Sequence, residues 1–212
     1  MLSRGPSKCM SYSMGKHKLY FVALLSAFII LIHYSDANCN KPCAKHHLNF
    51  MNFLTTNETI WTYYSTERTY PACKVYLFHY ISWGSVLFKR YYIKNLTTHR
   101  EDLTANITSS HPDLMFFAAA GICEQERLLY LGDTHKCAVV SVYRHAACPY
   151  SASPDHGEYF ELRVYNSSTT TGPDTDCVQQ FNRYGIPEKR VYSSDCQRIL
   201  LPGCRHSPCY GG

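Results

Sequence analysis

Residues 72–93 read ACKVYLFHYISWGSVLFKRYYI, which is two runs of aromatic and β-branched residues with Trp83-Gly84 between them. Runs of this composition, bounded by turn residues, are typical of β-strands. Six further runs of the same kind occur along the chain, at residues 60–69, 101–108, 113–120, 127–132, 136–145 and 158–166. Eight short strands at this spacing predict an all-β dominated fold and favour an antiparallel sandwich or a barrel.

The segments on either side of this strand region have a helical periodicity. Residues 44–54 place apolar side chains on one helical face, which predicts a short N-terminal helix. Residues 174–184 begin with the capping residue Asp174 and stop before Gly185, which predicts a C-terminal helix of about three turns. A short strand is expected at residues 190–192. The Cys-, Pro- and Gly-rich residues 196–212 are expected to lie against the domain under disulfide restraint.

Residues 1–37 have the pattern of a signal peptide. Basic residues lie within residues 4–18, an apolar run follows at 19–32, and Ser35 and Ala37 supply the small residues of a cleavage site. Because a membrane span needs roughly 20 apolar residues, this run is short for an anchor, which is the alternative interpretation. We expect cleavage after Ala37. The mature chain, residues 38–212, is then a single secreted domain that is not held in a membrane.

The composition narrows the function classes. Hydrophobic residues make up 45% of the sequence, which is too high for a disordered chain. The full chain has 21 basic and 16 acidic residues, but four of the basic residues and one of the acidic residues lie in residues 1–37. The mature chain is therefore nearly neutral, and it lacks the basic stripe that nucleic-acid-binding proteins carry.

Two sequence features agree with export. Sequons for N-glycosylation occur at Asn57, Asn95, Asn106 and Asn166. An even number of cysteines remains after cleavage, and in an oxidising compartment this predicts up to five disulfides. The ten cysteines are Cys39, Cys43, Cys73, Cys123, Cys137, Cys148, Cys177, Cys196, Cys204 and Cys209.

Cys39, Cys43, His46 and His47 are spaced like a cluster of metal ligands. In a secreted chain these cysteines are expected to be oxidised, which removes their thiolates as ligands. The sequence contains no recognisable catalytic signature and no glycine-rich phosphate loop. We therefore expect no metal, no cofactor and no enzymatic activity.

Several residues between about 45 and 200 stand in a characteristic order and spacing. They are Trp61, Cys73, Lys136-Cys137-Ala-Val-Val, Tyr159-Phe-Glu-Leu162, Cys177 and Cys196. In this order they resemble the tick salivary lipocalins of the histamine-binding protein family. The resemblance implies an eight-stranded antiparallel up-and-down barrel with one ligand-holding lumen, a short N-terminal helix and a C-terminal helix.

The resemblance also implies two disulfides, Cys73–Cys196 and Cys137–Cys177. The other pairs follow from the expected topology. Cys123 and Cys148 flank one predicted hairpin at comparable distances and are expected to pair. That leaves Cys39 and Cys43 for Cys204 and Cys209, which would tie both termini to the body of the domain.

The amine-binding signature of the family is a Cys-Asp-aliphatic step, then Glu-Leu-Trp/Tyr, then Cys. Here the matching residues are Cys137-Ala138-Val139, Glu161-Leu162-Arg163 and Cys177. Ala138 replaces the acid and Arg163 replaces the aromatic residue. An insertion that carries Cys148 also lengthens the gap between the first two steps.

The sequons indicate which strand positions face inward, since a glycan cannot enter a packed core. With Asn166 outward, Phe160, Leu162 and Val164 share the outward face, and the alternate residues point into the lumen. With Asn106 outward, Leu103, Ala105 and Ile107 point inward, and in the first strand Trp61 is expected inward. The candidate ligand-binding residues are Trp61, Tyr63, Glu67, Tyr159, Glu161, Arg163 and Tyr165.

Three interpretations of Glu161 and Arg163 remain open. A free inward Glu161 would attract a ligand ammonium, with tyrosine rings adding cation–π attraction. A free Arg163 guanidinium would instead hold the carboxylate of a fatty acid or leukotriene. In the third interpretation the two side chains pair with each other, close the lumen mouth and contact no ligand.

The expected function is sequestration of a small host mediator, such as histamine, serotonin or a lipid, by an abundant monomeric salivary protein. This would serve evasion of host defence during blood feeding. The alternative is an inhibitor of complement or coagulation that binds a host plasma protein through the loops at the barrel mouth. A secreted structural protein without a ligand is a third possibility.

Overall fold

The computed structural model describes residues 48–68, 71–119, 122–145, 147–148, 151–152, 157–184 and 189–202, which belong to one compact unit. A strand lies at each of the eight predicted positions. The strands are β1 (Ile60–Ser65), β2 (Ala72–Ser82), β3 (Ser85–Lys94), β4 (Thr97–Thr108), β5 (His111–Ala119), β6 (Ile122–Leu131), β7 (Cys137–Arg144) and β10 (Gly157–Tyr165).

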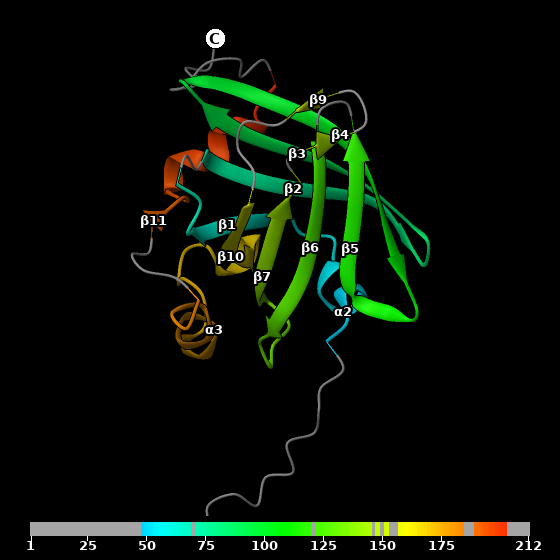
Figure 1. The fold of residues 1–212 in the computed structure, drawn as a ribbon. Helices are drawn as coiled ribbons and strands as arrows, with labels where there is room; N and C mark the ends of the chain where they lie inside the picture. Colours follow the sequence, from blue (N-terminus) through cyan, green and yellow to red (C-terminus); the bar gives the residue numbers. More distant parts are fainter. Residues whose placement is uncertain are drawn as a thin grey trace, which may run out of the picture. The chain divides into compact units, whose positions relative to one another are not determined.

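These eight strands form a closed barrel (Figure 1). Neighbouring strands are antiparallel in the order β1 to β7 and then β10, and β10 pairs back onto β1. This closing pair excludes the sandwich and confirms the up-and-down barrel. Two short strands, β8 (Ala147–Cys148) and β9 (Ser151–Ala152), form a separate hairpin, and β11 (Lys189–Arg190) pairs with β1.

One hydrophobic cluster lies on the inner side of the barrel, and all eight strands and the N-terminal helix contribute to it. It is called the interior cluster here. Its buried members are Phe50, Phe53, Leu54, Ile60, Tyr76, Val86, Phe88, Leu103, Ala105, Ile107, Met115, Phe117, Leu128, Ala138, Val140, Val142, Tyr159 and Tyr165. The inward positions expected for β4 are therefore confirmed. Asn106, between them, is exposed.

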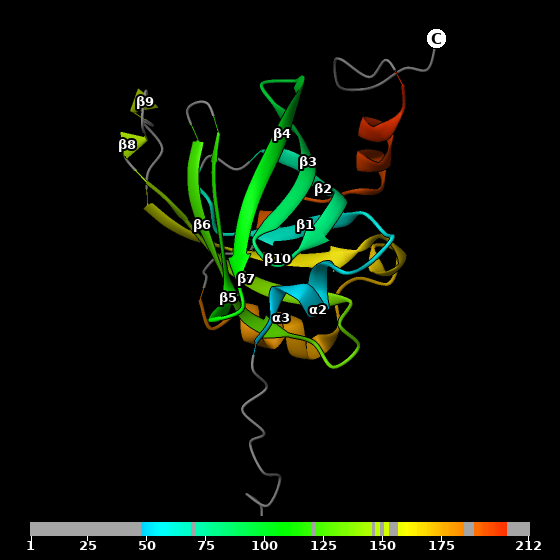
Figure 2. The same cartoon turned by 90° about the vertical axis from the view of Figure 1, so that its right-hand side faces the viewer.

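The N-terminal helix α2 (Phe50–Leu54) closes part of this cluster. Asn49 caps the helix, since its side-chain oxygen accepts a hydrogen bond from the backbone N–H of Met51 at 2.8 Å. Phe50, Phe53 and Leu54 are spaced three and four residues apart, so they share the face that packs inward. Figure 2 shows α2 toward the end of the barrel opposite β8 and β9. Residues 44–47 of the predicted helix lie outside the described residues.

A second cluster, called the outer cluster here, lies between the barrel wall and the C-terminal elements. These are α3 (Thr175–Phe181) and the 3-10 helix η2 (Ser194–Leu200), while a shorter one, η1 (Asn166–Ser168), follows β10. The helix predicted at residues 174–184 is thus present, but it has seven residues, about two turns, and ends at Phe181. The buried members of the outer cluster are Trp61, Tyr63, Cys73, Val75, Cys137, Val139, Leu162, Val164, Cys177, Phe181, Tyr192, Cys196 and Ile199.

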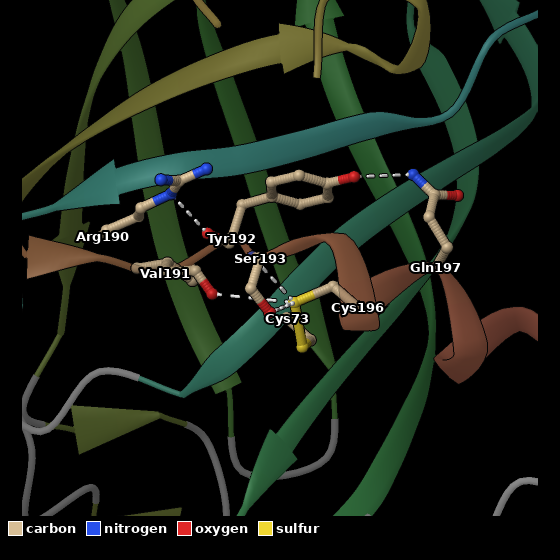
Figure 3. The surroundings of a disulfide bond; sticks show 7 residues. All are labelled: Cys73, Arg190, Val191, Tyr192, Ser193, Cys196 and Gln197. Carbon is tan, nitrogen blue, oxygen red and sulfur yellow. Dashed lines mark hydrogen bonds between the residues drawn. A yellow bond between two sulfur atoms is a disulfide. The ribbon is translucent and has the colours of Figure 1, made fainter. Parts of the chain in front are cut away.

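Two disulfides fasten the outer layer to the wall. Cys73 of β2 is bonded to Cys196 of η2 (Figure 3), and Cys137 of β7 is bonded to Cys177 of α3. Both pairs implied by the family resemblance are therefore confirmed. Cys123 is also disulfide-bonded, but the side chain of its expected partner Cys148 lies outside the described part of the chain. The expected pairing of Cys39 and Cys43 with Cys204 and Cys209 lies outside it as well.

The four asparagines of the sequons are exposed, as attachment of a glycan requires. They are Asn57, Asn95, Asn106 and Asn166. In the described part of the chain, no helix is both long and apolar enough to cross a membrane.

Candidate functional site

The barrel interior contains a group of buried ionisable side chains, which we call the interior charge network. Two of its members, Arg163 and Glu126, form a bidentate pair, with guanidinium nitrogens 2.6 and 2.7 Å from the two carboxylate oxygens. The guanidinium also lies over the ring of Tyr76, 4.3 Å from its centroid. Because a fork of this kind uses both ends of the guanidinium, Arg163 is not free to bind the carboxylate of a ligand.

Glu161 is the most heavily bonded acid of the network. One oxygen accepts from Lys74 Nζ at 2.6 Å, and the other accepts from Arg163 Nε at 2.8 Å and from two hydroxyl groups. Burial alone would raise the pKa of Glu161, but Lys74 and Arg163 together hold the pKa well below its usual range. The carboxylate therefore stays charged and its acceptor positions are filled. Of the three interpretations, the pairing of Glu161 with Arg163 is the one observed.

A second part of the network surrounds Glu124. Arg90 contacts this carboxylate at 2.7 Å and also contacts Glu101 at 2.6 Å. Burial would raise the pKa of Glu124, but Arg90, Lys74 and Arg144 outweigh it and lower the pKa to about 2. The cations thus keep this buried carboxylate ionised as well.

Arg144 joins the two parts and reaches Glu67. It donates to Glu124 Oε1 at 3.1 Å, to Glu67 Oε1 at 3.0 Å and to the hydroxyl oxygen of Tyr159 at 3.0 Å. Lys74 lies 3.4 Å from the same hydroxyl oxygen. The second oxygen of Glu67, Oε2, is buried and has no hydrogen-bond partner. It is the one buried carboxylate oxygen left unpaired in the described part of the chain.

The network carries an excess of negative charge. Its carboxylates are Glu67, Glu101, Glu124, Glu126 and Glu161, and its cations are Lys74, Arg90, Arg144 and Arg163. Five acids against four bases leave one net negative charge among these described residues. The side chains of Glu101 and Arg144 are 17% and 19% exposed, so the charge excess lies partly at the edge of the network, and the buried acceptor that lacks a partner is Oε2 of Glu67. An unpaired buried carboxylate oxygen is costly, and a bound cation would remove the cost.

The lowered pKa values of Glu124 and Glu161 predict a loss of stability in acid. Each folded-state pKa lies below the ordinary value of 4.5, so the carboxylates stabilise the fold fully above pH 4.5 and lose this contribution as the pH falls toward 2. Glu124 alone should account for about 2 kcal/mol between pH 7 and pH 3. Urea unfolding at the two pH values measures the difference. Equal free energies of unfolding would contradict the prediction.

The structure brings most of the predicted site residues together. Glu67 and Arg163 belong to the network, as does Glu161, and the hydroxyl of Tyr159 bonds to it. Tyr165 also faces inward but lies near α2, where its hydroxyl donates to the backbone oxygen of Phe53 at 2.6 Å. Whether these side chains contact a ligand remains a prediction.

Two residues of the predicted site, Trp61 and Tyr63, are not in the barrel interior, so the expectation that they point inward is wrong. Trp61 lies opposite Val164 of β10, and both belong to the outer cluster. A β-bulge in β1, where the register shifts between Thr62 and Tyr64, accounts for the error. One extra residue inverts the alternation, so the strand begins with Trp61 outward and continues with Glu67 inward.

Several functional candidates could not be recognised as such in the sequence. They are Lys74, Arg90, Glu124, Glu126 and Arg144. A signal was present, because Lys74 alternates with Tyr76, and Glu124 and Glu126 alternate with Leu128, so each shares a face with a core residue. Charged residues in strands ordinarily face solvent, however, and this default assigns them to the wrong face.

The described residues contain no group of three or more His, Cys, Asp or Glu side chains placed to hold a metal ion. The sequence cluster of Cys39, Cys43, His46 and His47 lies outside that part of the chain.

Comparison with known proteins gives distant structural neighbours only. No protein-family model matches the chain, and no curated protein matches it significantly. A deswapped triple mutant of bovine odorant-binding protein is 12% identical and covers 58% of this chain and 80% of its own, with a TM-score of 0.42. Lipocalin 12 from rat epididymis is 13% identical and covers 60% of this chain and 73% of its own, with a TM-score of 0.43. Likeness at this level carries no functional argument, and the barrel is established by the strand order.

Proposed function

We propose that this protein is a secreted, glycosylated lipocalin that binds a small organic cation in the barrel interior. The class of ligand is a biogenic amine such as histamine or serotonin, and the purpose is sequestration of a host mediator. The observation that carries the proposal is the buried, unpaired Oε2 of Glu67 within a network that has one excess negative charge.

An ammonium group supplies what this position lacks. A buried carboxylate oxygen without a donor costs free energy, and a charged N–H donor contributes more than a neutral one. The ligand would thereby also neutralise the excess charge of the network. Lipids are the less favoured ligands, because every cation of the described network already contacts a carboxylate.

The hydroxyl of Tyr159 supports a second point of recognition. Its oxygen accepts from Arg144 and Lys74, while its hydrogen has no acceptor among the described residues. Burial and the nearby carboxylates raise the pKa of Tyr159 well above its usual value, even though Lys74 opposes the shift, so the phenol keeps its proton. An amine that also carries an acceptor atom, such as the imidazole nitrogen of histamine, can use both groups.

The replacement Glu67→Gln tests the proposal. It keeps the shape of the side chain and the acceptor for Arg144, but it removes the charge. Isothermal titration with histamine should show binding weakened at least tenfold, since a charged hydrogen bond contributes about 1.5–3 kcal/mol. The control is Asp102→Asn, which removes an exposed carboxylate outside the interior and should leave the affinity unchanged. Unaltered histamine affinity in Glu67→Gln would overturn the proposal.

A further inference from the structure

A hollow lies on the outer wall of the barrel, on the opposite face of the sheet from the interior charge network. Its volume is about 440 Å³, and it is formed by β6, β7 and β10 together with the segment after α3. The lining residues are Gln125, Arg127, Leu129, Ser141, Tyr143, Glu158, Phe160 and Tyr184. Nothing in the amine-binding proposal involves these side chains.

The hollow exists because a small residue occupies the middle of the wall. Ser141 of β7 is flanked in register by Arg127 of β6 and Phe160 of β10, whose side chains are much larger. Phe160 is stacked on Tyr184 with ring centroids 5.0 Å apart, which builds an aromatic wall. Tyr143 lies two residues after Ser141 on the same face of β7, and it adds another aromatic side chain, which is 44% exposed.

Charges of opposite sign border the hollow on its two sides. The side chain of Arg127 is 51% exposed, and the carboxylate that it contacts, that of Asp113, is 3.7 Å away. Glu158 is exposed, and its Oε1 accepts a hydrogen bond from the hydroxyl of Ser141 at 2.5 Å. Its other carboxylate oxygen is left available. β7 separates their strands, and Glu158 is offset by two residues from the register position of Arg127, so the backbone positions of the two residues are about 12 Å apart.

This part of the wall is also free of predicted glycans. None of the four sequons falls on a lining residue of the hollow. The aromatic surface continues beyond the hollow, where the ring of His145 packs between Tyr143 and the exposed Phe116. Exposed aromatic residues beside an arginine are typical of the centre of a protein-binding surface.

We propose that this hollow docks an extended peptide segment of a partner protein, one that presents an aromatic side chain between an acidic and a basic residue. The aromatic side chain fills the space above Ser141, the acid contacts Arg127 and the base contacts Glu158. Alternate side chains of an extended peptide share a face, so the acid, the aromatic residue and the base stand at alternate positions, and the acid and base are about 13 Å apart along the chain at about 3.3 Å per residue. This span favours a peptide over a compact small molecule. The surface is distinct from the loops at the barrel mouth.

The test uses the secreted protein with a capped pentapeptide, acetyl-Glu-Gly-Trp-Gly-Lys-amide, and a neutral version with Gln at both charged positions. In titrations followed by ¹⁵N–¹H NMR, the charged peptide should shift the amide signals of β6, β7 and β10 around Ser141. Its affinity should fall at least threefold in Arg127→Gln and in Glu158→Gln, while the affinity of the neutral peptide should change in neither variant.

Ser141→Phe fills the hollow and should abolish the shifts for both peptides. Thr104→Phe places the same ring at an exposed position of β4 and serves as the matched control. Glu67→Gln should leave peptide binding unchanged, so this proposal can fail or hold independently of the amine site. Shifts that map to other strands, or equal binding by Ser141→Phe and the unmodified protein, would overturn it.

Discussion

Replacing Arg163 with methionine is expected to destabilise the barrel by about 3–5 kcal/mol. Methionine has a similar length, but the substitution leaves the buried Glu126 without the cation that it contacts, and it leaves the buried Glu161 with Lys74 alone. Breaking a buried pair is costly because the remaining charge has neither water nor a partner. Urea unfolding at pH 7, followed by tryptophan fluorescence, measures the loss.

Arg100→Met is the matched control for this prediction. Arg100 pairs with Asp102 on the surface, where both side chains are more than half exposed, so its removal should leave the free energy of unfolding nearly unchanged. The double variant Arg163→Met, Glu126→Gln should recover part of the lost stability, because it no longer buries an unpaired Glu126. A similar small loss in both single variants would show that the interior network is not fully formed.

Removing the disulfide between Cys73 and Cys196 with two alanines is expected to cost about 3–5 kcal/mol. The bond links residues 123 positions apart, at the start of the barrel and in the C-terminal segment (Figure 3). Its loss frees a long stretch of chain in the unfolded state, and it also releases η2 from β2. Guanidinium unfolding without reductant should therefore give a much lower midpoint than for the unmodified protein.

The second disulfide provides an internal comparison. Cys137 and Cys177 are only 40 positions apart, so the entropy model of loop closure predicts a cost about 1 kcal/mol smaller for their double alanine variant. The reverse order of stabilities would indicate that packing of the outer cluster, and not chain entropy, sets the contribution of each bond.

The positions of the eight barrel strands could be predicted from the sequence, because the composition of each strand reflects its environment. Each of the eight runs carries aromatic or β-branched residues between turn signals, and the closed barrel buries one face of every run. The orientation of β1 could not be predicted, because its bulge falls within Thr62-Tyr63-Tyr64, where no glycine marks it. A strict alternation that ignores the extra residue of the bulge therefore places Trp61 and Tyr63 in the barrel interior, although they belong to the outer cluster.

The candidate site was predicted less completely than the fold. The alternation of β10 correctly placed Tyr159, Glu161, Arg163 and Tyr165 inward. The partners of these residues come from strands far apart in sequence, and only the closed barrel brings Lys74 and Glu126 to the same place. Pairing of this kind cannot be derived from local pattern.

The two residues that depart from the signature of the resembled family, Ala138 and Arg163, are partners on neighbouring strands. Ala138 of β7 lies directly opposite Arg163 of β10, and both are buried in the barrel. A small side chain at 138 leaves space for the guanidinium, which then reaches Glu126 and Glu161. The arginine thus satisfies Glu161, and the buried carboxylate oxygen without a hydrogen-bond partner among the described residues belongs to Glu67.

An interior site for a cation at Glu67 is tested most directly by native mass spectrometry. The secreted, deglycosylated protein and its Glu67→Gln variant would each be mixed with histamine, serotonin, a leukotriene and arachidonic acid together. We expect a one-to-one adduct with an amine for the unmodified protein and none for the variant. A lipid adduct, or an amine adduct of equal abundance in both proteins, would contradict the claim.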